Sequence, residues 1–172
     1  MEFFDVINAR HSMRAFTEQT IEQEKIYAIL DAANRAPSAG NKQGYEIYAV
    51  TNHAVLCALR LAAFDQEFIS QAPLAFVFCA NPARSAEKYG ERGESLYSVQ
   101  DATIACAYAQ LAATALGLAS TWVGAFNEDS ARAAIRVSND LLPVAILPIG
   151  YAGKEPRIRP RRALEDLVKW IE

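Results

Sequence analysis

Residues 95–117 read SLYSVQDATIACAYAQLAATALG and form the longest stretch of this sequence that predicts a helix. Seven alanines lie between Ala102 and Ala115, and Gly117 occupies a position where helices commonly end in a left-handed residue. Alanine side chains are small, so a helix of this composition lets neighbouring backbones come close. We therefore expect this helix at the centre of the fold, either under a sheet or at an interface between subunits.

Apolar runs before and after this helix predict buried strands. Leu74–Ala80 (LAFVFCA) is continuously apolar, which is typical of a strand buried on both faces. Val144–Tyr151 (VAILPIGY) has the same character, although it contains Pro148. Two further strands are expected at Tyr45–Thr51, which is rich in β-branched and aromatic residues, and at Ala119–Val123.

Helices are expected around these strands. Thr20 and Gln23 have the spacing of a capping box, which predicts that a helix opens there. Arg84–Ser95 is the most polar stretch, so we expect a mobile excursion and treat it as a candidate lid. Phe64 and Phe68, four residues apart, are expected as an apolar helical pair at a subunit interface. The other helices are expected at Glu2–Ala9, Thr20–Ala33, Ala54–Ala62, Glu128–Arg136 and Ala163–Ile171.

The composition is that of a globular protein with one hydrophobic core. Of 172 residues, 52% are hydrophobic and 22% are charged, and the net charge is −3, so we expect one soluble domain over residues 1–172. No apolar run approaches the roughly 20 residues of a membrane span, and the acidic balance disfavours binding to nucleic acid. Cys57, Cys79 and Cys106 have apolar neighbours and no metal-ligand spacing, which predicts buried thiols in a reducing, cytoplasmic compartment and no metal site.

Basic residues concentrate near both ends of the chain. The N-terminal cluster, Arg10–Arg14 (RHSMR), combines two arginines with a hydroxyl, a set that suits a phosphate or another dianion. The C-terminal cluster, Lys154–Arg162 (KEPRIRPRR), holds five basic residues and one acidic residue. Alternate residues of an extended chain point the same way, so Arg157, Arg159 and Arg161 can converge on one anion. Each cluster alone is more often a solvated terminal segment, so an anion site needs further support.

A polar loop is expected after the second helix, at Ala36–Gln43 (APSAGNKQ). It offers backbone amides, a hydroxyl and two carboxamides, which suit the ribityl hydroxyls and the polar edge of a flavin ring. The same residue types are ordinary turn formers at the end of a helix. The loop alone does not decide between a flavin contact and a helix C-terminal turn.

Five segments in a fixed order resemble the nitroreductase-like FMN-dependent oxidoreductases. They are RHSMRAF, APSAGNKQ, GLASTWVGAF, LPIGY and a terminal R-x-R followed by RALEDLVKW, and the similarity covers essentially the whole chain. The resemblance implies an α+β fold with a central, mostly antiparallel sheet surrounded by helices. It also implies an intertwined homodimer with two non-covalently bound FMN molecules at the subunit interface.

The resemblance also assigns roles to residues. The two basic clusters would hold the flavin phosphate, the polar loop would approach the same flavin from the other subunit, and the backbone of residues 123–125 would lie beside the isoalloxazine ring and donate an N–H to its N5 atom. The implied cofactor-binding residues are Arg10, His11, Ser12, Arg14, Ser38, Ala39, Gly40, Asn41, Gln43, Val123, Gly124, Ala125, Arg159 and Arg161. Two departures stand out: Arg10-His11 replaces two successive arginines, and Gly44-Tyr45 replaces Pro-Trp.

The implied activity is transfer of reducing equivalents from NAD(P)H through FMN to small planar acceptors such as nitroaromatics or quinones. Donor and acceptor would take turns on one face of the flavin, and no catalytic side chain is expected because the flavin carries the chemistry. Trp122, Phe126, Tyr89 and Tyr97 are candidates for the substrate pocket, while core packing or loop anchoring are their alternatives. The alternative functions are a specialised flavin enzyme, either a reductive dehalogenase or a flavin-fragmenting enzyme, and a non-catalytic flavin- or nucleotide-binding protein.

Overall fold

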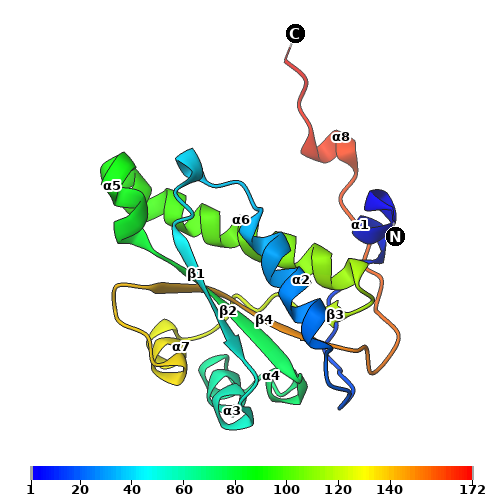
Figure 1. The fold of residues 1–172 in the computed structure, drawn as a ribbon. Helices are drawn as coiled ribbons and strands as arrows, with labels where there is room; N and C mark the ends of the chain where they lie inside the picture. The colour runs from blue at the N-terminus through cyan, green and yellow to red at the C-terminus, as the bar shows by residue number, and fades with distance from the viewer. Residues whose placement is uncertain (1, 172) are drawn as a thin grey trace.

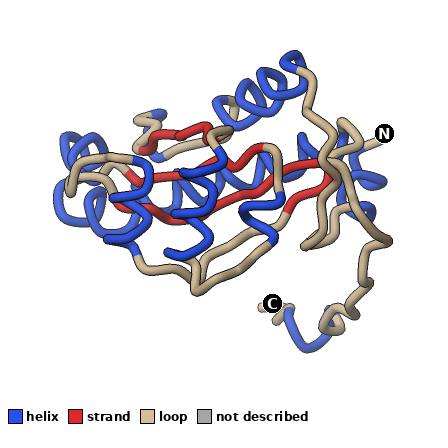
Figure 2. The backbone as a smooth tube through the Cα atoms, turned by 90° about the horizontal axis from the view of Figure 1, so that it is seen from below, coloured by secondary structure: helices blue, strands red, loops and turns tan. Residues whose placement is uncertain are grey.

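A four-stranded sheet with helices on both faces forms the body of the computed structural model, which describes residues 2–171 (Figures 1 and 2). The strands lie in the order β1-β2-β4-β3, and each neighbouring pair is antiparallel. The expected α+β class with a central antiparallel sheet is therefore confirmed. The elements are α1 (Phe3–Ala9), α2 (Gln23–Asn34), β1 (Tyr45–Val50), α3 (His53–Ala62), α4 (Phe68–Gln71), β2 (Leu74–Ala80), α5 (Pro82–Arg92), α6 (Ser98–Ala115), β3 (Ala119–Ser120), α7 (Glu128–Ile135), β4 (Leu142–Gly150) and α8 (Leu164–Leu167).

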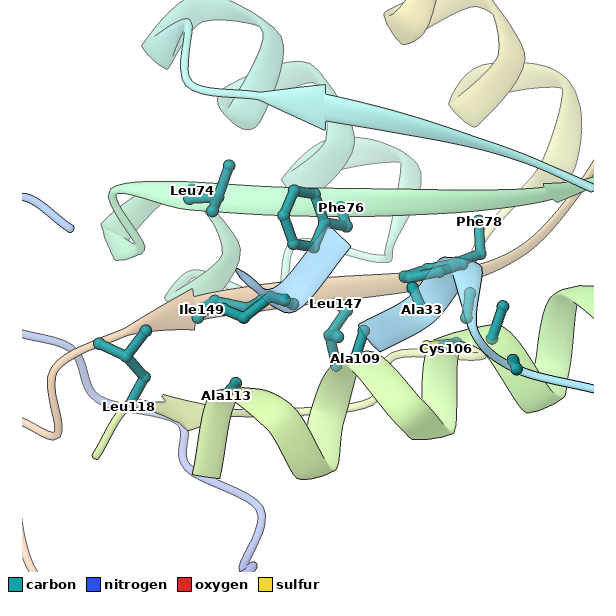
Figure 3. Close-up of a cluster of buried hydrophobic side chains, with 14 residues drawn as sticks. Ala33, Leu74, Phe76, Phe78, Cys106, Ala109, Ala113, Leu118, Leu147 and Ile149 are labelled. Carbon is teal, nitrogen blue, oxygen red and sulfur yellow. The ribbon is translucent and has the colours of Figure 1, made fainter. Parts of the chain in front are cut away.

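The two faces of the sheet are covered by different helices. Side chains alternate along a strand, so Phe76 and Phe78 of β2 lie in the hydrophobic cluster with α2 and α6 (Figure 3). Val77 and Cys79 lie in the second cluster, with α3, α4 and α7. Every residue of β2 is buried, which confirms the prediction of a strand covered on both faces.

Helix α6 packs directly on the sheet, as its alanines predict. Ala109 and Ala113 face β2 and β4 in the first cluster (Figure 3). The helix ends in left-handed Gly117 (φ 77°), whose amide donates to the carbonyl of Thr114 while the amide of Leu118 donates to that of Ala113. Neither α6 nor another helix of residues 2–171 combines the length and the apolar character needed to cross a membrane.

Residues 84–95, expected as an irregular excursion and a candidate lid, form regular helical structure instead. These residues form most of α5 and part of a π-helical turn, Gly93–Tyr97, that leads into α6. The side chain of Asn81 caps the first turn of α5, and Ser85 is fully buried while the charged residues face solvent. The stretch is therefore an amphipathic helix, and its charged residues form the exposed face.

Two helix boundaries also differ from the expectation. Helix α2 begins at Gln23 rather than at Thr20, because Glu22 keeps an extended backbone (ψ 137°) and its carboxylate accepts a hydrogen bond from Tyr151 (2.7 Å). Helix α8 is one turn rather than a helix to Ile171. Its apolar side chains are exposed, and a short helix without packing is marginal.

The predicted helical pair of Phe64 and Phe68 does not form. Phe64 and Asp65 both have left-handed backbone conformations (φ 55° and 61°), which end the helical run after α3. Phe68 belongs to α4 and is buried in the second hydrophobic cluster, whereas Phe64 is exposed. The four-residue spacing therefore spans a turn, and only one of the two rings contributes to the core.

The three cysteines are free thiols. Cys79 and Cys106 are buried as expected, while Cys57 is half-buried. Burial, together with the nearby Glu46 carboxylate, raises the pKa of Cys79 to about 12, and burial also raises the pKa of Cys106. Both buried thiols are therefore protonated at neutral pH. Within residues 2–171, no three His, Cys, Asp or Glu side chains gather in a group that could hold a metal ion.

Candidate functional site

The N-terminal and C-terminal clusters line one cavity of about 520 Å³. Its lining residues are Arg10, His11, Ser12, Met13, Arg14, Lys154, Glu155, Pro156, Arg157, Arg159 and Arg161. Six of these are Arg or Lys, and Glu155 supplies the carboxylate. The fold thus brings together two clusters that are about as far apart in the sequence as the chain allows.

Pairing between the first and last parts of the chain places the clusters side by side. The amide of Met13 donates to the carbonyl of Ser120 in β3 (2.9 Å), so the N-terminal cluster lies along the end of the sheet. The amide of Gly153 then donates to the carbonyl of Ala15 (2.8 Å), just after β4 has ended. The chain therefore enters the C-terminal cluster directly beside the N-terminal one.

The positive charge of this cavity exceeds its negative charge, since Glu155 is the one carboxylate among six basic residues in the lining. Burial lowers the pKa of the Arg10 guanidinium, and the nearby charge of Arg161 lowers it further. Within residues 2–171, none of the arginines that line the cavity forms an ion pair with a carboxylate. Like charges held together in this way favour a bound anion, and guanidinium groups with the Ser12 hydroxyl match the oxygens of a phosphate. These residues fit the phosphate of FMN.

The polar loop is a separately built turn rather than the end of α2. Ala39–Asn41 form a 3₁₀ turn that begins after α2 has already ended. The Ser38 hydroxyl accepts a hydrogen bond from the amide of Gln43 (3.0 Å), which closes the loop on itself. Gly40, Asn41 and Gln43 have left-handed backbone conformations (φ 54°, 55° and 50°). The loop is therefore a structured turn that follows α2, and its shape alone does not decide whether it contacts a flavin.

Asp101, which was not among the predicted site residues, binds the polar loop at Ala39 and the residue that follows the loop, Gly44. Its Oδ1 accepts a hydrogen bond from the amide of Ala39 (3.0 Å), and its Oδ2 accepts one from the amide of Gly44 (3.1 Å). These contacts join residues far apart in the chain, so no local pattern reveals them. The signal that was available is that Asp101 is the one charged residue within the sequence of α6.

Tyr89 and Tyr97 lie beside the polar loop. A Cβ at Gly40 would lie 2.3 Å from the Tyr89 hydroxyl oxygen. The absence of a side chain at Gly40 therefore allows Tyr89 to pack against the loop. The two tyrosine rings pack edge to face, with their centroids 5.1 Å apart. Tyr97 also lines a second cavity of about 510 Å³ together with Ser38 and Ala39.

Trp122 and Phe126 lie away from this tyrosine pair. Trp122 packs against the cluster of α2 and α6, and Phe126 packs against the cluster of α3, α4 and α7. Both rings are half-buried, and neither lines the cavity that Tyr97 shares with Ser38 and Ala39. Of the four aromatic candidates, only Tyr97 lines this cavity.

The backbone of residues 123–125 offers two amides rather than three. The amide of Val123 donates to the carbonyl of Ile146 (2.9 Å) and is not free to bind a cofactor. Gly124 and Ala125 are exposed, and their amides donate to no other residue of the described chain. The candidates for the predicted N–H donor to the flavin N5 atom are therefore Gly124 and Ala125.

Two groups of predicted site residues, the polar loop and the basic cavity, lie at opposite ends of α6 (Figure 1). Asp101, in the first turn of α6, holds the polar loop, whereas β3, which follows α6, holds the N-terminal cluster through Ser120. A helix of 18 residues is about 27 Å long. The polar loop and the basic cavity of one chain are therefore well separated.

The chain is similar to known proteins over nearly its whole length. Residues 7–66 and 58–151 match the model of the Nitroreductase family. A protein of Archaeoglobus fulgidus, with NADH dehydrogenase/NAD(P)H nitroreductase in its name, is 30% identical over 90% of this chain and 87% of its own length. The FMN reductase (NADPH) of Bacillus subtilis is 28% identical over 92% of this chain and 70% of its own length.

A solved structure agrees with the sequence comparison. A nitroreductase family protein from Clostridium difficile superposes with a TM-score of 0.87 and 31% identity, over 99% of this chain and 98% of that protein. The matched residues include the N-terminal cluster, the polar loop and the 123–125 backbone. From the family model, the sequence identity and the shared fold, the chain belongs to the nitroreductase family.

Proposed function

We propose that the protein transfers reducing equivalents from NAD(P)H through FMN to small planar acceptors, such as nitroaromatics or quinones. As a member of its family the chain is an NAD(P)H-dependent oxidoreductase. The observation that carries the FMN assignment is the convergence of two arginine clusters on one cavity, where none of these arginines forms an ion pair within residues 2–171. Bound FMN supplies two-electron redox chemistry, since it can accept a hydride from a nicotinamide and reduce an acceptor.

The chain's own residues hold and orient the cofactor in this proposal. Arg10, Arg14, Arg159 and Arg161 bind the phosphate with the Ser12 hydroxyl, because guanidinium forks and a hydroxyl share its oxygens. The exposed amides of residues 124 and 125 donate to the N5 edge of the ring. The polar loop supplies carboxamide and hydroxyl groups to the ring and the ribityl chain.

Each site is proposed to form between two copies of the chain. The basic cavity and the polar loop lie at opposite ends of α6, so a second copy that brings its polar loop to the cavity would complete the site. Exposed apolar side chains support such a homodimer, because an uncovered apolar surface is typical of an interface. They include Phe3 and Phe4 of α1, and Trp170 (88% exposed) and Ile171 (97%) on the C-terminal arm that extends from the body (Figures 1 and 2).

The proposal also covers the domain organisation, the cellular compartment and the binding partners of the protein. Residues 1–172 act as one FMN-binding domain in each subunit. Free thiols at Cys57, Cys79 and Cys106 support a reducing, cytoplasmic compartment. Small molecules, rather than nucleic acid or membrane, are the proposed partners besides the second subunit.

Steady-state kinetics test the shared use of one flavin face. If NAD(P)H leaves before the acceptor binds, initial-rate plots against NAD(P)H at several acceptor concentrations should be parallel, the pattern of ping-pong kinetics. The measurement needs the FMN-loaded protein, one nicotinamide and a quinone or a nitroaromatic compound as acceptor. Intersecting lines would mean that both substrates bind together and would contradict the shared face.

A further inference from the structure

Asp101 is a buried carboxylate without a basic partner. It is 2% exposed, and within residues 2–171 it forms no ion pair with Lys, Arg or His. A buried charge is costly unless good hydrogen bonds satisfy its lone pairs. Its two oxygens each accept one backbone amide, from Ala39 and from Gly44. Both oxygens of Asp101 therefore bind backbone amides that bracket the 3₁₀ turn of the polar loop.

The polar loop requires an anchor because its backbone is strained. Asn41 and Gln43 carry side chains, yet their φ values are 55° and 50°. A left-handed backbone is costly for residues with a Cβ and persists only where surrounding contacts fix it. Within the loop, the Ser38 hydroxyl supplies one such contact to the amide of Gln43. Asp101, which lies on helix α6, supplies two further contacts from outside the loop, to the amides of Ala39 and Gly44.

A close fit at Gly44 fixes the same end of the loop. A Cβ at this position would lie 2.0 Å from the Ser85 Oγ of α5 and 3.3 Å from the Asp101 Oδ2 of α6. Ser85 is fully buried, and its hydroxyl has no hydrogen-bond partner among residues 2–171. The two helices therefore close on residue 44 so tightly that any side chain larger than hydrogen displaces a neighbour.

We infer that Asp101 is a positioning residue for the FMN site, which holds the polar loop in the shape in which Ser38–Asn41 meet the flavin. The fit between Ser85 and Gly44 fixes the end of the loop that Asp101 binds. This inference rests on the proposed function, because the flavin is the group that the loop is proposed to contact. A group that only stabilised the fold would change the unfolding temperature and leave the properties of bound flavin unaltered.

Asp101→Asn tests the anchor directly. Asparagine has a similar size, but it offers one acceptor oxygen and turns an NH₂ group towards the second amide. In the flavin-free protein, hydrogen exchange at the amides of Ala39 and Gly44 should accelerate. The Kd for FMN should rise by roughly 10- to 100-fold, and the reduction potential of the FMN that binds at saturation should differ from that in the wild type. Cys106→Ala is the control, because it alters a buried residue of the same helix and should leave loop exchange and the Kd for FMN unchanged.

Gly44→Ala provides a second, independent test. The added methyl group meets the Ser85 Oγ, so the loop should shift and the Kd for FMN should rise. Ser85→Ala in the same chain removes that oxygen and leaves the Ser85 Cβ at 3.3 Å from the new methyl group, so most of the FMN affinity should return. Because relief of this clash would also restore stability, the unfolding temperatures of the flavin-free variants are measured beside the Kd, and a loss of FMN affinity without a matching loss of stability indicates a local shift of the loop.

The outcomes separate this inference from the proposed function. Unchanged exchange at Ala39 and Gly44 in Asp101→Asn would overturn the inference, and so would faster exchange with an unchanged Kd for FMN. If Asp101→Asn does not fold, the Gly44 series decides, and the absence of rescue by Ser85→Ala overturns the inference. A wild-type protein that binds no FMN overturns the proposed function and the role in flavin positioning with it, while the exchange rates still report whether Asp101 holds the loop.

Discussion

Arg161→Ala is expected to weaken FMN binding by about 10- to 100-fold, while the flavin-free protein remains at least as stable as the wild type. The weaker binding follows from the loss of one charge-assisted hydrogen bond to a phosphate, worth about 1.5–3 kcal/mol. The retained stability is expected because burial lowers the pKa of Arg10 and the charge of Arg161 lowers it further, a repulsion that alanine relieves. FMN titration and thermal unfolding, with and without FMN, measure both effects.

Arg162→Ala is the matched control for this experiment. It removes the same charge from the next residue, but Arg162 is not among the residues that line the cavity and instead donates to the backbone carbonyl of Asp166. We expect its Kd for FMN to stay near the wild-type value. An equal loss in both variants would indicate a general charge effect, and an unchanged Kd in Arg161→Ala would remove this residue from the phosphate site. Arg14→Ala is expected to behave like Arg161→Ala.

Two inactive variants are expected to restore each other's activity in a mixed dimer. If one subunit supplies the basic cavity and the other the polar loop, Arg161→Ala and Asn41→Ala damage opposite halves of each site. In the mixed dimer, both lesions fall on one site and the other site is intact. The doubly tagged dimer should therefore recover up to about half of the wild-type flavin content and activity, as two-fold symmetry requires.

Comparison of the mixed dimer with the two parent homodimers decides whether each FMN site is shared between subunits. Each parent homodimer carries one lesion in both sites and should retain little flavin after dialysis. If each site lay within a single subunit, every site of the mixed dimer would also carry one lesion, and nothing would be recovered. A flavin-free, inactive mixed dimer would therefore contradict the site between subunits and leave the FMN assignment intact.

The parts of the fold that could be predicted are those specified by local patterns. Seven consecutive apolar residues predict β2, which the structure shows to be fully buried. The alanines of residues 102–115, with Gly117, predict α6 and its end. Each of these signals depends on near neighbours in the sequence, through alternation, side-chain size or a left-handed terminal residue. Local signals of this kind also located β1, α3 and α7 to within a few residues.

The errors arose where tertiary contacts outweigh local preference. Thr20 and Gln23 have capping-box spacing, but the bond between Glu22 and Tyr151 holds the backbone extended and delays the start of α2. The charges of α5 indicate a loop by composition, yet its buried face packs on the polar loop. Neither contact has a signature within a window of a few residues.

The candidate site was predictable as a set of residues but not as an arrangement. The N-terminal and C-terminal clusters each suggest an anion site, and only the pairing of Gly153 with Ala15 shows that they share one cavity. The separation of the polar loop from that cavity likewise depends on the path of α6. Asp101 escaped notice because its role depends on amides of Ala39 and Gly44, which belong to a different part of the chain.

Anaerobic reduction of the purified protein tests the central claim most directly. The protein is loaded with FMN, freed of unbound flavin and recorded by visible absorption before and after addition of NADH or NADPH. We predict flavin absorption bands that co-purify with the protein and bleach on addition of at least one of the two nicotinamides. A protein that retains no flavin would contradict the FMN site, and bound flavin that neither nicotinamide reduces would contradict the proposed oxidoreductase activity.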